Sequence, residues 1–274
     1  MNSMSLENRW SNRFDAREAL YTGESGLNYW EARAGDFSEM RVSKQYEYGK
    51  KILAVLEPLL PANAWVLDIG AGPGSLLVPF GPKVKQFTAI EPAVNMVAEL
   101  RRNAEKAGIE NYEVLQVPWQ DVDTDRFRSR FDLVMISIPL WMFRDIWRQI
   151  LRMEQVCKGY CCVITGADQD PDGHGPSLWK KITGDIPKPS YTEFPFIFNL
   201  LYANGRRPEV RTFSHRAERS VESRIRQQKL FYAKYVNLTP SHEAAIEDFV
   251  EKTATNGMVQ ETYTSAVVWW KPAL

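Results

Sequence analysis

An acid near the end of a short apolar strand, followed by three glycines, is the part of this sequence best suited to binding chemistry. The strand is Trp65–Ile69, the acid is Asp68, and the glycines are Gly70, Gly72 and Gly74. A loop that opens a helix presents unpaired backbone N–H groups, which attract anionic groups. Glycine lets the backbone approach a ligand closely and tolerates positive φ. The segment is therefore predicted to hold a polar ligand that carries both an ammonium and a carboxylate group.

A second acid and the other loop residues extend this site. Glu91 ends the next apolar run, and a carboxylate accepts two hydrogen bonds side by side, as two ribose hydroxyls would offer. Pro73 has no N–H, so the loop donors are expected from residues such as Ala71, Gly74 and Ser75. Together these features indicate a site for a nucleotide-type cofactor.

Alternating apolar runs and amphipathic segments must position these residues. Strands are predicted over Trp65–Ile69, Phe87–Ile90, Tyr112–Val117, Phe131–Ile138 and Tyr160–Thr165. Between them, helices are predicted from near Ser75, over Pro92–Ala107 and over Ile146–Glu154. This alternation predicts a parallel sheet with helices on both of its faces.

The two ends of the chain have different patterns. Residues 26–60 have helical periodicity and are predicted to form an N-terminal helical cover. Beyond the fifth strand, a helix, a strand, two helices and a final strand are predicted, over Phe196–Ala203, Glu209–Phe213, Val221–Leu238, 240–257 and Thr262–Trp270. The two helices before the final strand predict a helical insertion at about 221–257.

The motifs resemble those of class I S-adenosylmethionine (SAM)-dependent methyltransferases of the small-molecule type. Asp68–Gly74 is similar to the family's hh-D-h-G-x-G-x-G signature, and Ala89–Pro92 resembles its acidic second-strand motif. Val114–Asp121 resembles the third-strand motif near the adenine, and Phe131–Val134 the fourth-strand motif. The resemblance covers about residues 29–165. It implies an α/β, Rossmann-like, doubly wound sheet of seven mostly parallel strands with an antiparallel last strand, residues 1–60 being a cover and residues 61–274 the SAM-binding domain.

The resemblance also implies roles for the matching residues. Asp68 and the loop Gly70–Gly74 would hold the methionine part of SAM, and Glu91 the ribose. Met96 and Trp119 would pack near the adenine. The complete set implied to contact the cofactor is Asp68, Gly70, Ala71, Gly72, Gly74, Glu91, Pro92, Met96, Trp119, Gln120, Ser137 and Ile138.

One position departs from the family's pattern. Many relatives have an Asp near position 118, where this chain has Pro118, so Gln120 or Asp121 is expected to replace that contact with the adenine. The expected cofactor is SAM, the expected product is S-adenosylhomocysteine (SAH), and no metal is expected.

A dinucleotide-binding dehydrogenase is the main enzymatic alternative. Its Gly-x-Gly-x-x-Gly fingerprint would require a glycine where this chain has Ser75, and an apolar strand residue where it has Asp68. Both departures favour the methyltransferase.

The acceptor side is less determined by the sequence. The fourth strand ends in residues 137–140 without the Asn/Asp-Pro-Pro-Tyr/Phe pattern of enzymes that methylate planar amino groups, so adenine N6 and glutamine amides are not expected acceptors. A base is needed only if the acceptor must lose a proton. His174, in an acidic loop, is the candidate base, and His215 and His242 are weaker ones. The candidate substrate contacts are Tyr29, Trp30, Arg33, Trp141, Tyr191 and Tyr202.

The composition limits the classes of partner and the cellular location that are expected for this protein. The 34 basic and 34 acidic residues give zero formal charge, which argues against a nucleic-acid partner. No apolar run reaches the roughly 18 residues that span a bilayer. The three cysteines, Cys157, Cys161 and Cys162, form no Cys-x-x-Cys pair, so a cytoplasmic location is expected.

Two functions therefore stay open at this point. The first is a methyltransferase acting on a small molecule through an O, N, S or C nucleophile. The second is a non-catalytic module that binds SAM or SAH. RNA methylation and NAD-dependent oxidation are less favoured, and the oligomeric state is not determined by the sequence.

Overall fold

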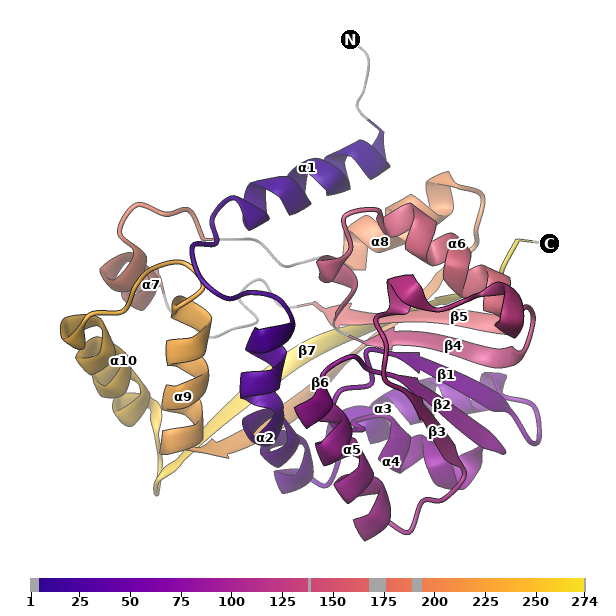
Figure 1. Ribbon diagram of the computed structural model, residues 1–274, viewed down its shortest axis with the longest axis horizontal. Coiled ribbons are helices and arrows are strands. Elements are labelled where there is room, and N and C mark those ends of the chain that lie inside the picture. The colour runs from indigo at the N-terminus through magenta and orange to yellow at the C-terminus, as the bar shows by residue number, and fades with distance from the viewer. Residues whose placement is uncertain (1–4, 138, 168–175, 189–193, 274) are drawn as a thin grey trace.

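Seven strands form one sheet at the centre of the molecule (Figure 1). The computed structural model describes residues 5–137, 139–167, 176–188 and 194–273. The strand order is β3-β2-β1-β4-β5-β7-β6. The strands are β1 Trp65–Ile69, β2 Gln86–Ile90, β3 Tyr112–Leu115, β4 Phe131–Ser137, β5 Cys157–Gly166, β6 Glu209–Ser220 and β7 Met258–Trp270.

Strand direction follows the expected doubly wound pattern. Strands β1 to β5 pair in parallel, and β7 pairs antiparallel with both β5 and β6. The register sets Asp68 opposite Ala89 of β2 and Met135 of β4. The chain winds outward from β1 to β3 and returns at β4, so the carboxyl ends of β1, β2 and β4 meet where such sheets bind ligands. The predicted Rossmann-like sheet with its antiparallel last strand is confirmed.

Helices cover both faces of the sheet because their apolar stripes face it. One face carries α3 (Glu47–Leu56), α4 (Leu77–Phe80) and α5 (Val94–Lys106). The other carries α6 (Ile146–Val156) and α8 (Phe194–Ala203), with α1 (Leu6–Glu18) above them (Figure 1). None of the described helices is long and apolar enough to cross a membrane.

The helical insertion lies between β6 and β7, as predicted. Helices α9 (Val221–Tyr232) and α10 (Pro240–Thr253) pack with α7 (Pro176–Thr183) around a separate apolar cluster. Figure 1 shows these three helices beside the far end of the long β6–β7 ribbon. Helix α2 (Leu27–Ser43) contacts α5, β6 and α9, and so bridges the sheet and the insertion.

Several boundaries differ from those that the sequence predicts. Helices α1 and α7 were not expected, and the helix predicted over 221–238 ends at Tyr232. Strand β6 continues to Ser220 instead of ending at Phe213, and its buried residues beyond that point include His215 and Arg219. A strand whose buried face is polar lacks the apolar alternation by which strands are recognised.

Candidate active site

Two adjoining cavities open near the carboxyl ends of β1, β2 and β4. The first, of about 280 Å³, contains Asp68 and Glu91 and is named here the acidic cavity. The second, of about 220 Å³, is lined by Arg33, Arg41, Arg219 and Lys234 and is named the basic cavity. Four residues line both cavities, namely Trp30, Phe37, Arg41 and Tyr48.

Asp68 is the central acid of the acidic cavity. Its side chain is buried at the end of β1, and its Oδ1 has no hydrogen-bond partner among the described residues. Burial raises the pKa of Asp68 to about 8, and the neighbouring charge of Glu91 adds to this shift. An unpartnered buried acceptor that lines a cavity matches a ligand that brings a cationic donor.

Glu91 fixes the glycine loop at the same time as it lines the cavity. Its Oε2 accepts a hydrogen bond from the Gly72 N–H at 2.8 Å, and its Oε1 accepts one from the Ala93 N–H at 2.9 Å. Burial raises the pKa of Glu91, and these two backbone bonds oppose the shift. Each carboxylate oxygen can accept one further hydrogen bond, so two positions remain for a ligand.

The glycine loop takes its conformation from positive φ angles. Gly70, Gly72 and Gly74 have φ of 71°, 54° and 84°. A Cβ on Gly72 would lie 3.9 Å from the Met96 Sδ and 3.9 Å from a Phe37 ring carbon, both cavity-lining residues. The bare glycine therefore leaves open space that a side chain would occupy.

The N–H groups of the loop are partly engaged within the protein. Gly70 and Ala71 both donate to the Ile90 carbonyl, at 2.8 and 3.1 Å, and Gly74 donates to the Ala71 carbonyl at 3.1 Å. Of the donors that the sequence suggests, Ala71 and Gly74 are thus used to hold the loop. The Ser75 hydroxyl lines the acidic cavity and has no partner among the described residues.

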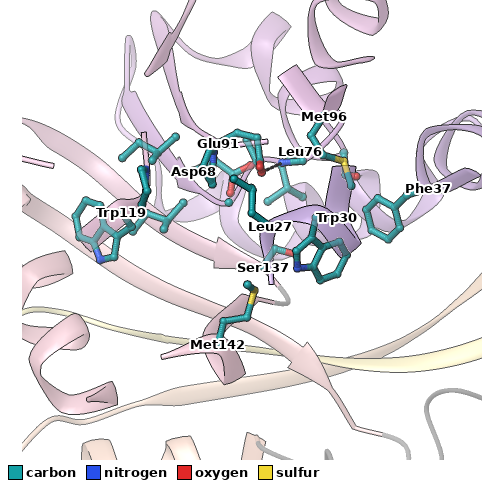
Figure 2. A pocket seen from close by; sticks show the side chains of 18 of the residues that line it. Leu27, Trp30, Phe37, Asp68, Leu76, Glu91, Met96, Trp119, Ser137 and Met142 are labelled. Atoms are coloured by element: carbon teal, nitrogen blue, oxygen red, sulfur yellow. Dashed lines mark hydrogen bonds between the residues drawn. The ribbon is translucent and has the colours of Figure 1, made fainter. Parts of the chain in front are cut away.

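The acidic cavity is closed by apolar and aromatic groups at its two ends. Figure 2 shows Trp119 on one side of the two acids and Trp30 and Phe37 on the other. Trp119 is buried, and Arg152 lies 5.0 Å over its ring and donates to its carbonyl at 2.9 Å. Helix α2 is fastened above the cavity because Glu31 accepts hydrogen bonds from the first N–H groups of α5.

The junction of the two cavities contains a short polar link. The Tyr48 hydroxyl and the Ser137 Oγ are 2.7 Å apart, which connects α3 to the end of β4. His215 lies against Tyr48, with 4.8 Å between ring centroids, and its Nε2 is 3.2 Å from the Ser265 Oγ. Of the histidines considered from the sequence, His215 thus lies in the basic cavity. His242 instead caps α10 together with Thr239.

The structure brings most of the predicted site residues together. Of the eleven predicted cofactor contacts among the described residues, all but Gly74 line the acidic cavity. Gly74 instead packs against Leu100 of α5, and a Cβ built on Gly74 would lie 3.3 Å from the Leu100 Cγ. Three predicted contacts lie outside the described residues, namely Ile138, Tyr191 and the candidate base His174.

The predicted substrate contacts divide into two groups. Tyr29, Arg33 and Trp141 line the basic cavity, and Trp30 lines both cavities. Tyr202 lines neither. It is 58% exposed at the end of α8, with the Arg207 guanidinium 5.3 Å from its ring, because α8 turns its apolar residues toward the sheet.

Several residues of the basic cavity had no signal in the sequence. Arg41 comes from α2, Tyr48 from α3, Arg219 from β6 and Tyr263 from β7, and Lys234 follows α9. No motif joins them, because five different helices, strands and loops supply one of these residues each. The burial of Arg219 in β6, which is unusual for the residue type, appears only in the structure.

The described part of the chain contains no group of three metal-ligating side chains. The cysteines are free and buried, and burial raises the pKa of the Cys161 and Cys162 thiols. A buried thiol with a raised pKa is a poor nucleophile and a poor metal ligand. These cysteines therefore act as core residues.

Comparisons with known proteins agree with this geometry. Residues 66–158 match the family model described as "Methyltransferase domain". The fold resembles that of the YcgJ protein from Bacillus subtilis, with a TM-score of 0.55, 16% identity, and coverage of 83% of this chain and 99% of that one. No curated protein sequence matches the chain significantly.

A second solved structure extends along nearly the whole chain. Magnesium protoporphyrin IX methyltransferase (ChlM) from Synechocystis PCC 6803, with SAH bound, aligns with a TM-score of 0.50 and 16% identity, and covers 94% of this chain and 93% of that one. At such identities these likenesses concern the fold. The chain therefore contains a methyltransferase domain, and its strand order and the motif residues gathered in the acidic cavity agree with the class I SAM-dependent methyltransferase fold.

Proposed function

We propose that the enzyme binds SAM in the acidic cavity and transfers its methyl group to a small-molecule acceptor in the basic cavity. One observation carries this proposal: the two cavities adjoin and share Trp30, Phe37, Arg41 and Tyr48. Methyl transfer requires donor and acceptor to meet in line with water excluded. A junction lined by three aromatic rings supports both requirements.

The residues of the acidic cavity suit each part of SAM. The unpartnered Oδ1 of Asp68 would accept a hydrogen bond from the ammonium group of the methionine part, and the Ser75 hydroxyl would donate one to its carboxylate. The free acceptor positions of Glu91 would take the ribose hydroxyls. Met96 and Trp119 would flank the adenine.

SAM supplies an activated methyl group, whose carbon bonds to the acceptor nucleophile as its bond to the sulfonium sulfur breaks, leaving SAH. The protein's own task is therefore to position the acceptor in line with the methyl group and to exclude water. Tyr48 and Ser137 hold each other at the junction, and Phe37 and Trp30 form its apolar wall. His215 would accept a proton where the acceptor must lose one.

The first 60 residues are proposed to act as a cover that completes both cavities. In helix α1 the Trp10 Nε1 donates to the Phe143 carbonyl at 2.7 Å, and Arg17 donates to the Trp141 carbonyl at 2.5 Å. The segment held in this way supplies Trp141 to the basic cavity and Met142 to the acidic one. A covered site favours a small-molecule acceptor over a nucleic acid, and we propose a cytoplasmic enzyme.

Calorimetry followed by turnover tests the proposal. SAM and SAH should both bind the purified chain, and transfer of a radiolabelled methyl group should occur with members of a panel of small molecules. Binding of SAM without transfer to any of them would favour the non-catalytic module. Absence of SAM binding would overturn the assignment of the acidic cavity.

A further inference from the structure

The basic cavity combines buried guanidinium groups with flat aromatic walls. Three arginines line it, Arg33 from α2, Arg41 from α2 and Arg219 from β6, and no Asp or Glu is among its lining residues. Its aromatic lining residues are Tyr29, Trp30, Phe37, Tyr48, Trp141, Phe231 and Tyr263. A ligand that matches such a lining is planar and apolar over most of its surface and anionic at one end.

Arg41 is the least compensated of these cations. It is 7% exposed, its Nε has no hydrogen-bond partner, and no carboxylate among the described residues pairs with it. Its guanidinium carbon lies over two aromatic rings, 4.1 Å from the Tyr48 ring centroid and 4.9 Å from that of Phe37. Burial lowers the pKa of Arg41 to about 10, and the nearby charges of Arg219 and Arg33 act in the same direction. Arg41 therefore remains charged at neutral pH while lacking an anion.

Among the described residues, the carboxylate in contact with one of these three arginines is Glu261, which is not one of the residues that line the cavity. Glu261 contacts Arg219 at 3.1 Å and Arg224 at 2.6 Å, so one negative charge is shared by two arginines. Arg33 has a hydrogen bond to the Tyr29 hydroxyl at 3.0 Å, and its Nε has no partner among the described residues. Buried charges that are not paired are costly, so the excess of cations points to an anionic ligand.

We propose that the methyl acceptor is a planar, mainly apolar carboxylate whose carboxylate group is bound by the guanidinium groups of Arg41 and Arg219. This inference rests on the proposed function, because it assigns the substrate class of the same site. The guanidinium fork of Arg41 matches a carboxylate with two parallel hydrogen bonds. Arg219, whose terminal nitrogens already contact Gln227 and Glu261, adds its positive charge. The aromatic walls receive the flat body of the acceptor by stacking.

Binding of matched probes to the SAH-saturated enzyme tests the inference without requiring turnover. Benzoate and 2-naphthoate carry the carboxylate, 2-naphthamide replaces it with a neutral group of similar shape, and 2-naphthyl phosphate carries a different anion. Calorimetry should show that 2-naphthoate binds at least about tenfold tighter than 2-naphthamide, as charge-assisted hydrogen bonds predict. Equal affinities, or absence of binding by both carboxylates, would overturn the inference. Tighter binding of the phosphate would overturn the assignment of the carboxylate.

Variants then locate the anion. Arg219→Gln and Arg41→Gln should each remove most of the preference of the enzyme for naphthoate over naphthamide, and Arg41→Lys should restore part of it. Arg211→Gln is the matched control, because Arg211 lies exposed on the same strand as Arg219. Since Arg41 lines both cavities, Arg219→Gln separates an acceptor effect from a change in SAH binding. A preference that survives both substitutions would overturn the inference, whereas loss of SAH binding by the unmodified enzyme would instead refute the proposed function.

Discussion

The two cavities contain different ionisable groups and meet at the same four side chains. The acidic cavity contains the buried carboxyl groups of Asp68 and Glu91, whereas the basic cavity contains Arg33, Arg219 and Lys234, and Arg41 lines both. A sulfonium donor would suit the acidic cavity, and an anionic acceptor would suit the basic cavity. Because Coulomb attraction is strong where water is excluded, the two ligands would also draw toward each other across the junction. Under the proposed function, this division of ionisable groups would let one enclosed space distinguish donor from acceptor.

The largest effect is expected from a substitution in the acidic cavity. Gly72→Val should abolish measurable SAM binding, because the side chain would enter the space between Met96 and Phe37 that the bare glycine leaves open. The positive φ of 54° adds a strain of roughly 1–2 kcal/mol to the folded state. Calorimetry measures the binding and circular dichroism checks the fold.

A matched control separates strain from occupancy of the cavity. Gly108 has a similar φ of 66°, and its Cβ would meet nothing within 4 Å. Gly108→Val should therefore cost similar stability and leave SAM binding unchanged. Normal binding by Gly72→Val would show that the loop is not the ligand's cradle.

Asp68→Asn should weaken SAM binding while stabilising the ligand-free protein. Loss of a charge-assisted hydrogen bond predicts about 2–3 kcal/mol of lost affinity. The pKa of Asp68 rises from 3.8 to about 8 on folding, so the folded protein keeps a proton that the unfolded chain has lost, and stability falls as the pH rises from 3.8 to about 8. Asparagine removes this penalty, so at pH 7 the melting temperature should rise, whereas exposed Asp185→Asn should change neither quantity.

The same pKa predicts that SAM binding releases a proton. At pH 7 the Asp68 carboxyl is mainly protonated in the ligand-free enzyme, and an ammonium group favours its ionised form. Affinity should therefore rise as the pH increases toward about 8. Calorimetry at pH 7 in two buffers of different ionisation enthalpy should reveal release of about one proton, and Asp68→Asn should abolish this release. No dependence on the buffer would contradict the assignment of Asp68 to the ammonium.

The two cavities also differ in how many of their lining residues could be predicted from the sequence. The acidic cavity comes largely from consecutive strand ends and their loops, and parallel register alone brings Asp68 beside the segment that ends in Glu91. The basic cavity depends on how α2, α3, β6, α9 and β7 pack, and one of its charged residues, Arg219, lies on a strand face without apolar alternation. Local patterns carry the first kind of information, whereas tertiary packing decides the second.

A smaller effect is expected at the ribose position, where it sharpens the role of the second acid. Glu91→Ala should weaken SAM binding by about 1–3 kcal/mol, because the Gly72 and Ala93 N–H groups lose their acceptor together with the ribose contact. Glu91→Gln keeps one acceptor oxygen and should cost less. Competition with adenosine, which lacks the methionine part, separates the two acids: Glu91→Gln should weaken adenosine binding, and Asp68→Asn should leave it unchanged. Equal effects of both variants on adenosine would remove the ribose assignment.

The smallest effect is expected at the junction itself. Tyr48→Phe removes the 2.7 Å hydrogen bond to the Ser137 Oγ but keeps the ring on which Arg41 lies. Loss of one neutral hydrogen bond predicts about 1 kcal/mol, or roughly a fivefold fall in kcat with little change in SAM affinity. Steady-state kinetics with a panel compound that the enzyme methylates measures the effect. Tyr46→Phe serves as the control, because Tyr46 lies outside both cavities. A large change in SAM affinity with unchanged kcat would show that Tyr48 acts only in binding SAM. Tyr48 would then not be a shared side chain that positions the methyl transfer.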